Sequence, residues 1–130
     1  MLVILFRHGP AGSSDPKRWP DDSLRPLTAK GEKRTRLAAE GLARLLRNVP
    51  PKRLAVWTSP LVRADQTARL AAAALGGGKS VEPVVVSALA PGGSMRGLLE
   101  RLSEAASAAK NDDVAVVLVG HEPDLGQLAG

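Results

Sequence analysis

Short apolar runs alternate with longer polar stretches along this chain, and the alternation predicts its elements. The apolar runs are 2–6, 54–57, 81–86 and 114–119. Runs of this length that are rich in β-branched and aromatic residues are typical of buried strands. The stretches between them show helical spacing of apolar residues. Strands that alternate with helices predict a parallel sheet with right-handed connections.

The first helix is expected to begin after Thr28, because threonine commonly caps helix N-termini. Its predicted apolar face repeats at helical spacing and comprises Leu37, Ala38, Gly41, Leu42, Leu45 and Leu46. Basic residues occupy most of its remaining surface, which indicates a solvated face. Pro50 and Pro51 are expected to end this helix.

The second helix is expected to start with Ser59 as its N-cap and Pro60 at its first helical position. We interpret Ser59 as a cap rather than a nucleophile, because the sequence assigns it no acid–base partner. This helix is expected to stop at glycines 76–78. Ser94 is expected to cap a third helix, and Asp124 to begin a fourth.

Residues with chemical potential follow three of the predicted strands, at the ends where parallel sheets form ligand sites. Arg7, His8 and Gly9 follow the first strand, Arg63 lies after the second, and His121 follows the fourth. Histidine can act as a nucleophile, arginine binds phosphate oxygens, and glycine lets a ligand approach the backbone. Because the ends of parallel strands share one edge, we expect these residues to converge in one pocket.

Length and composition fit a single domain over residues 1–130, with 44% hydrophobic residues. No apolar run approaches the roughly 18 residues that a membrane span needs, and no basic segment precedes 2–6 as in a signal peptide. The chain is therefore expected in the cytoplasm, without a membrane partner. It has no cysteine and two histidines, so thiolate and multi-histidine metal sites are excluded. We expect no metal and no other cofactor.

The formal net charge is +5, and a basic chain is a candidate for nucleic-acid binding. The aromatic content is only 2%, which disfavours stacking on bases. We therefore interpret the basic residues as a solvated surface, together with arginines that bind an anionic substrate. No nucleic-acid partner is expected.

Taken in order, the motifs resemble those of the histidine phosphatase superfamily, which includes phosphoglycerate mutases and acid phosphatases. The matching segments are Arg-His-Gly at 7–9, Arg-Pro-Leu-Thr-Ala-Lys-Gly at 25–31, Ser-Pro-Leu-Val-Arg-Ala-Asp-Gln-Thr at 59–67 and Gly-His at 120–121. The short chain and the Arg-Pro-Leu-Thr form are similar to SixA-type phosphohistidine phosphatases, small bacterial enzymes linked to phosphorelay proteins. The resemblance implies an α/β three-layer sandwich of the phosphoglycerate mutase type, with a mostly parallel sheet and helices on both faces.

The resemblance also implies roles for individual residues. His8 would be the nucleophile, and Arg7, Arg63 and His121 would surround the transferred phosphate, where positive charge is needed. The substrate-binding residues it implies are Arg7, Gly9, Arg25 and Arg63. Four alternatives stay open: Arg25 could simply lead into the first helix, and His8 could be a buried structural histidine. Likewise, Arg63 could be a surface arginine, and His121 could merely cap a loop.

The chain departs from the family pattern in the residue that protonates the leaving group. Larger branches of the superfamily place an acid after the third strand, and here segment 87–94 has none. An imidazole that leaves from a labile P–N bond needs less protonation than an alkoxide, so the departure favours phosphohistidine as substrate. Asp22, in the long polar loop 10–26, is the candidate replacement donor, with Asp15 and Asp21 as alternatives.

A second departure is the end of the sequence at Gly130. Members of the family usually continue through a helix and at least one more strand. We therefore expect residues 1–130 to be a single histidine phosphatase domain whose C-terminal part is missing.

The leading hypothesis is a phosphatase that transfers a phosphoryl group to His8 and then to water. Its expected partner is a phosphohistidine-bearing protein of the phosphorelay type, or else a small phosphorylated substrate. A second hypothesis is a small-molecule phosphomonoesterase or mutase of the same superfamily, against which the missing acid counts. A third is a non-catalytic phosphate-binding module, which would require a lost nucleophile, whereas His8 is present.

Overall fold

A parallel sheet forms the centre of the protein in the computed structural model, which describes residues 1–7, 17–48, 50–108, 114–121 and 124–129. Within these residues the strands are β1 (Leu2–Arg7), β2 (Arg53–Thr58), β3 (Val84–Val85) and β4 (Val114–Gly120). Their order across the sheet is β1-β4-β2-β3, and every pairing is parallel. β1 therefore lies at one edge of the described sheet, where Leu2 and Val3 are exposed.

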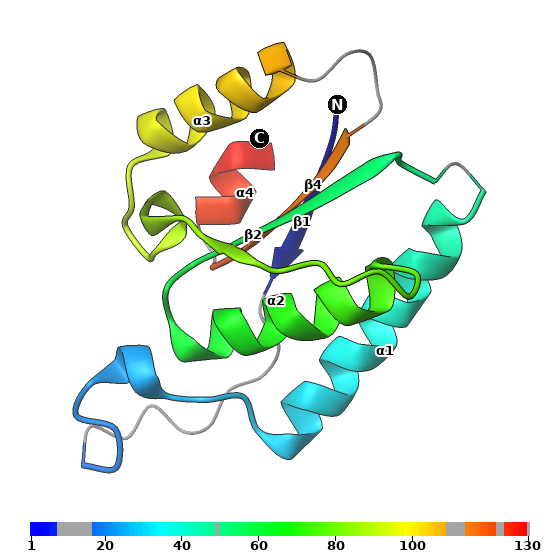
Figure 1. The fold of residues 1–130 in the computed structure, drawn as a ribbon. Coiled ribbons are helices and arrows are strands. Elements are labelled where there is room, and N and C mark those ends of the chain that lie inside the picture. The colour runs from blue at the N-terminus through cyan, green and yellow to red at the C-terminus, as the bar shows by residue number, and fades with distance from the viewer. Residues whose placement is uncertain (8–16, 49, 109–113, 122–123, 130) are drawn as a thin grey trace.

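Helices cover both faces of this sheet, as Figure 1 shows. Helices α1 (Ala29–Leu46) and α2 (Val62–Leu75) lie on one face, and α3 (Met95–Ala108) and α4 (Asp124–Ala129) lie on the other. Two short 3₁₀ turns, η1 (Asp22–Leu24) and η2 (Ser87–Leu89), precede α1 and α3. The predicted α/β fold, with a parallel sheet between two helical layers, is confirmed.

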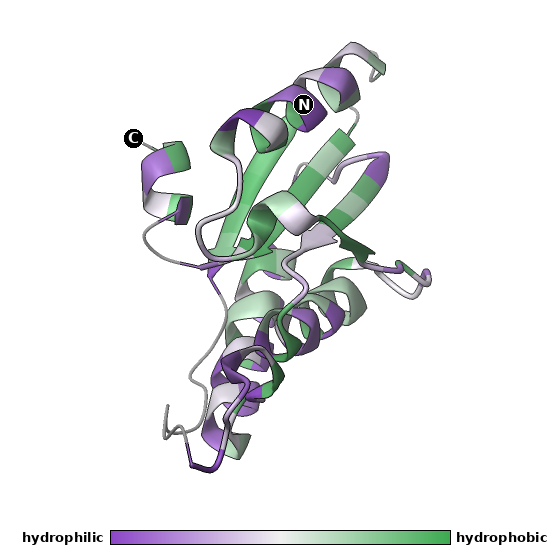
Figure 2. Ribbon diagram, turned by 90° about the vertical axis from the view of Figure 1, so that its left-hand side faces the viewer, coloured by the Kyte–Doolittle hydropathy of each residue, from purple (hydrophilic) through white to green (hydrophobic). Residues whose placement is uncertain are grey.

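Two hydrophobic cores form because successive side chains of a strand point to opposite faces. Val117 and Val119 of β4 pack toward α2, whereas Val116 and Leu118 pack with α3 on the other face. Figure 2 shows the hydrophobic strands between the more hydrophilic surfaces of the helices. Because it is buried on both faces, β4 is a nearly continuous apolar run, as parallel central strands usually are.

Helix α1 buries a different face from the predicted one. Leu37, Ala38 and Leu45 are exposed, Leu45 at 71%, and the buried residues are Gly31, Thr35 and Ala39. The cause is the element beside α1. Helix α1 packs against the alanine-rich helix α2 rather than directly against the sheet. Small residues spaced by four form a low ridge that lets two helices approach closely. The prediction of Leu37, Ala38 and Leu45 as core residues was wrong.

The ends of the elements follow local hydrogen bonding. Thr28 caps α1 as predicted, since its Oγ1 accepts a hydrogen bond from Gly31 N at 2.9 Å. Ser59 is not the N-cap of α2, which is Leu61. The reason is that Ser59 N still donates to Val119 O in the sheet ladder, at 3.0 Å, so the helix begins only at Val62. Pro60 is therefore outside the helix.

The third strand is shorter than the predicted run 81–86. Only Val84 and Val85 pair with β2, because Pro83 has no N–H to donate to a ladder. Three other predicted boundaries hold: α2 ends at Leu75 with Gly76 as its C-cap, Ser94 Oγ accepts from Gly97 N at the start of α3, and α4 begins at Asp124. Helix α1 ends at Leu46, earlier than the expected stop at Pro50.

The packing of β4 predicts a large loss of stability for Leu118→Ala. Leu118 is 0% exposed in the middle of the α3-side core, and removing a buried leucine side chain costs about 2–5 kcal/mol. Urea unfolding should show a lower midpoint with little change in slope. The matched control is Leu45→Ala on the exposed face of α1, which should change the free energy of unfolding by less than about 0.5 kcal/mol. Equal effects of the two substitutions would contradict this packing.

Candidate active site

The carboxyl edge of the sheet gathers residues from three strands. Arg7 at the end of β1 pairs with Gly120 at the end of β4, and Thr58 at the end of β2 pairs with Val119. The register therefore brings Arg7, Ser59 and His121 to the same edge, as predicted for Arg7 and His121. His8 and Gly9, which follow Arg7 directly in the chain, lie outside the described residues.

His121 is buried at this edge and is held by Ser59. Its Nε2 lies 2.8 Å from Ser59 Oγ, and both residues are buried. Ser59 Oγ also accepts a hydrogen bond from Leu61 N at 3.2 Å. The backbone of His121 is fixed as well, because its carbonyl accepts from Leu125 N at the first turn of α4. The imidazole is thus oriented by a group that sequence analysis had interpreted as a helix cap.

Arg63 is the buried cation of the site. It is the second residue of α2, and its side chain is 7% exposed. Its Nη1 donates to the carbonyl of Asp22 at 2.9 Å, and its Nη2 donates to Asp22 Oδ2 at 3.0 Å. Its Nε is buried without a hydrogen-bond partner among the described residues. A buried charged donor in this state is unfavourable until another group, such as an anion, accepts from it.

Asp22 joins Arg63 to Arg25. Arg25 Nε donates to Asp22 Oδ1 at 2.8 Å, so one carboxylate bridges the two guanidinium groups across η1. The hydrogen bond from Arg25, reinforced by the charge of Arg63 and partly opposed by desolvation, lowers the pKa of the Asp22 carboxyl. A carboxyl with a lowered pKa is ionised near neutral pH, which is unfavourable for the role of proton donor that the sequence had suggested.

A backbone tether holds the segment before α1 against α2. Leu27 N donates to Gln66 Oε1 at 2.8 Å, across 39 positions of sequence. Gln66 lies one turn after Arg63, so the tether fixes the position of the Arg25 segment relative to Arg63. Sequence analysis quoted Gln66 within a motif without giving it a role. Its spacing of three residues from Arg63 was the available signal, because i and i+3 share one face of a helix.

The segment 87–94 has no acid of its own, but α4 supplies one beside it. Asp124 Oδ2 accepts a hydrogen bond from Gly92 N at 3.0 Å, in the turn that precedes α3. This contact ties the start of α4 to the loop after β3. Sequence analysis treated Asp124 only as the start of a helix.

Comparison with known proteins assigns the family. The model of the histidine phosphatase superfamily (branch 1) matches residues 3–90, which is more than half of the chain. The chain belongs to the histidine phosphatase superfamily. The matched span includes Arg7, Arg25 and Arg63 and ends before β4 and His121. The predicted resemblance is therefore confirmed, and this membership supports phosphatase activity.

Individual relatives agree with this assignment. An uncharacterized protein of Picosynechococcus is 44% identical over 130 residues, covering 99% of this chain and 71% of its own. A solved structure of the protein histidine phosphatase SixA complexed with tungstate is 32% identical, with a TM-score of 0.74, and the match covers 99% of this chain and 74% of that one. The chain is thus similar to SixA-type enzymes, as the sequence predicted.

More distant structures agree in fold. A phosphoglycerate mutase from Plasmodium falciparum is 17% identical with a TM-score of 0.61, and the match covers 98% of this chain and 65% of that one. This similarity confirms the phosphoglycerate mutase-like fold.

Two features are absent from the part of the chain that the structure describes. No three His, Cys, Asp or Glu side chains come together there in a way that could hold a metal ion. None of the helices in that part has the length and apolar character required to cross a membrane.

The bridge between Arg25 and Arg63 predicts the titration of Asp22. We expect its carboxyl to titrate below its ordinary range in carbon-detected NMR, and Arg25→Gln to raise its pKa toward the ordinary value. Because folding lowers this pKa, the bridge stabilises the protein at neutral pH, and the contribution is lost as the pH falls through the lowered pKa. Arg36→Gln, on the exposed face of α1, is the matched control. An Asp22 pKa that is the same in both variants would rule out the bridge.

Proposed function

We propose that this protein is a phosphatase that moves a phosphoryl group from phosphohistidine to His8 and then to water. Its substrate in this proposal is a phosphohistidine-bearing protein of the phosphorelay type, which implies a cytoplasmic location. Family membership supports phosphatase activity, and the similarity to a protein histidine phosphatase supports the substrate class. The observation that carries the proposal is the buried Arg63 beside the carboxyl edge of the sheet.

Arg63 supports a phosphoryl site for two reasons. Its burial reduces solvent screening, so its charge acts on a bound anion more strongly than that of a surface arginine. Its Nε is a donor with no acceptor among the described residues, and a phosphoryl oxygen is an acceptor of the right charge. Arg7 and Arg25 add positive charge from β1 and from the segment before α1.

The first half of the proposed reaction forms a phosphoenzyme. A ring nitrogen of His8 attacks phosphorus, the P–N bond to the substrate imidazole breaks, and the electron pair of that bond returns to the substrate nitrogen. The arginines balance the charge on the equatorial oxygens while this happens. The substrate imidazole leaves as a neutral group when it is protonated before or during departure.

The second half returns the enzyme to its starting state. A water oxygen attacks phosphorus, the P–N bond to His8 breaks, and inorganic phosphate leaves. One proton of the water passes to the released His8 ring or to phosphate. In this proposal His121, whose orientation is set by Ser59, contacts the phosphoryl oxygens in both halves.

In this proposal no proton donor is assigned among the described residues, and this assignment bears on the leaving group. Asp22 is paired with two arginines and has a lowered pKa, so in this arrangement it binds cations rather than delivering a proton. Segment 87–94 contains no Asp or Glu. Without a proton donor, leaving groups that depart easily are favoured, and imidazole is such a group.

The proposed nucleophile predicts the outcome of His8→Ala. With a ³²P-labelled phosphohistidine protein as substrate, the variant should release no phosphate and carry no label after quenching. The parent enzyme should carry a label that is stable in base and lost in acid, as phosphohistidine is. The matched control is His121→Ala, which keeps His8 and should still acquire the label, at a lower rate. An acid-stable label on Ser59, or labelling of the His8→Ala variant, would contradict the mechanism.

The proposed lack of a proton donor predicts the leaving-group dependence. We expect kcat/KM for 4-nitrophenyl phosphate to exceed that for an alkyl monoester such as phosphoglycerate by about 10²-fold or more, the range that general acid catalysis normally supplies.

The control for this comparison is Asp22→Asn, which should leave the ratio of the two kcat/KM values unchanged even if both values fall. Similar values for aryl and alkyl substrates in the parent enzyme would reveal a proton donor. A ratio that appears only in Asp22→Asn would identify that donor as Asp22.

A further inference from the structure

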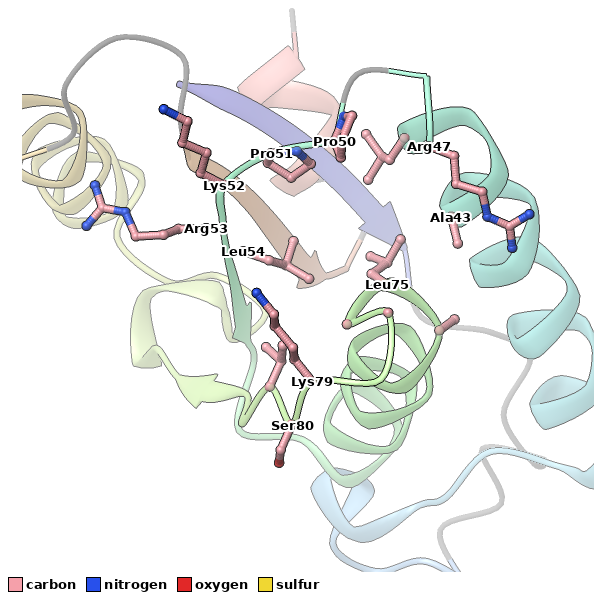
Figure 3. A pocket seen from close by; sticks show the side chains of 15 residues that line it. Ala43, Arg47, Pro50, Pro51, Lys52, Arg53, Leu54, Leu75, Lys79 and Ser80 are labelled. Atoms are coloured by element: carbon pink, nitrogen blue, oxygen red, sulfur yellow. The ribbon is translucent and has the colours of Figure 1, made fainter.

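A hollow lies at the amino end of β2, at the opposite end of that strand from Ser59 and His121. It is bordered by the carboxyl ends of α1 and α2 and by the start of β2, as Figure 3 shows. Its volume is about 580 Å³, which is within the range of small-molecule sites. Arg53 and Leu54 open β2 at this hollow, whereas Thr58 closes the strand next to the candidate active site.

The wall of the hollow is largely apolar. The aliphatic residues that line it are Ala43, Leu46, Leu54, Ala74, Leu75 and Val81. Leu54, Leu75 and Val81 are partly buried and also pack against the core between the sheet and α2, so the wall is continuous with that core. An aliphatic group bound here would bury apolar surface, and each Å² buried stabilises the complex by about 25 cal/mol.

The rim of the hollow is basic. Arg47, Lys52, Arg53 and Lys79 line it, and none of the described lining residues is an aspartate or glutamate. In Figure 3 the Lys79 side chain extends toward Leu54, whereas Lys52 and Arg53 extend away from the space. Lys79 can therefore contact a ligand in the hollow directly, whereas Arg47, Lys52 and Arg53 contribute positive electrostatic potential around it. The carboxyl ends of helices attract cations, which accounts for basic residues here but not for an apolar hollow behind them.

The position of Lys79 is set by a turn that only glycine allows. Gly76 N donates to Ala72 O at 2.9 Å, and Lys79 N donates to Gly76 O at 3.0 Å. Gly77 and Gly78 have φ of 58° and 89°, and a Cβ on Gly76 would lie 2.5 Å from Lys79 O. The three glycines thus close the end of α2 tightly and return the chain to the rim of the hollow.

We propose that this hollow binds a small amphipathic anion. A carboxylate or phosphate head would pair with Lys79, and a short aliphatic body would lie against Leu54 and Leu75. The site is separate from the phosphoryl site, because it lies at the other end of β2. Its occupancy does not depend on the proposed phosphatase reaction.

The test compares ligands that share a body or a head. Octanoate and octyl phosphate should both bind in calorimetric titrations, octan-1-ol should bind at least tenfold more weakly, and inorganic phosphate should also be weaker than octyl phosphate. Amide shifts in NMR should map to the turn after α2 and to the start of β2. A higher salt concentration should lower the affinity for octanoate, because the contact between its carboxylate and Lys79 is near the surface and is screened.

Variants separate the charge contact from general effects. Lys79→Glu should lower the affinity for octanoate tenfold or more, and Lys79→Gln should give a smaller loss with the same sign, which keeps the test valid if the glutamate variant folds poorly. Lys33→Glu, an equal charge change on the exposed side of α1, should leave the affinity within twofold.

Three outcomes of these experiments would overturn the proposal, and a fourth concerns peptides. The three are equal binding of octanol and octanoate, unchanged octanoate affinity in both Lys79 variants, and amide shifts confined to the α3 and α4 face. Binding of an acidic peptide but of none of the small anions would assign the hollow to a protein partner and would likewise overturn it.

Discussion

The burial of β4 on both faces is the constraint on which the rest of the structure depends. β4 pairs in parallel with β1 on one side and with β2 on the other, and five consecutive residues from Ala115 to Val119 are buried. A slip of one residue would reverse the face of every side chain in the strand. This burial fixes the register of β1 and β2 against β4. It therefore also fixes the positions of Arg7, Ser59 and His121 at the carboxyl edge of the sheet. The site is thus positioned by the core.

The two charged partners at the site, Arg63 and Asp22, differ in burial. Arg63 is buried in the first turn of α2. Asp22, which bridges Arg63 and Arg25, has a side chain that is 55% exposed, and ion pairs to such exposed groups contribute little. The carboxylate therefore keeps the arginines in place without binding them strongly. A phosphoryl group carries more charge than one carboxylate, so it can compete for the same donors.

Much of the fold could be predicted because it depends on local signals. The strand 114–119, the Thr28 cap and the glycine stop after α2 are set by apolar runs, capping side chains and backbone freedom over a few residues. The faces of α1 could not be predicted, because the choice of Gly31, Thr35 and Ala39 over Leu37 and Leu45 depends on which helix lies beside it. That neighbour is a property of the whole arrangement.

The candidate site also has features that the sequence predicts and features that it does not. The positions of Arg7, Arg63 and His121 near one edge of the sheet could be predicted, because each lies at or shortly after the end of a strand. The contact between Ser59 and His121 joins residues 62 positions apart, and the tether from Leu27 to Gln66 joins residues 39 positions apart. Such pairs depend on side-chain geometry, which apolar periodicity does not encode. The same is true of Asp22, whose side chain pairs with Arg63 across 41 positions of sequence.

The place of β1 at the edge of the described sheet has a consequence for how the protein moves. β1 is paired on one side only within that sheet, and its first residues are exposed, whereas β4 is enclosed by two neighbours. Local opening needs the least free energy where few contacts must be broken. Of the two strands that lead into histidines, β1 is therefore the one that can separate from the sheet more readily, since β4 is paired on both sides. The strands β1 and β4 thus differ in how readily they open, and in the proposed reaction the adjustment to a phosphorylated protein would come from the side of β1.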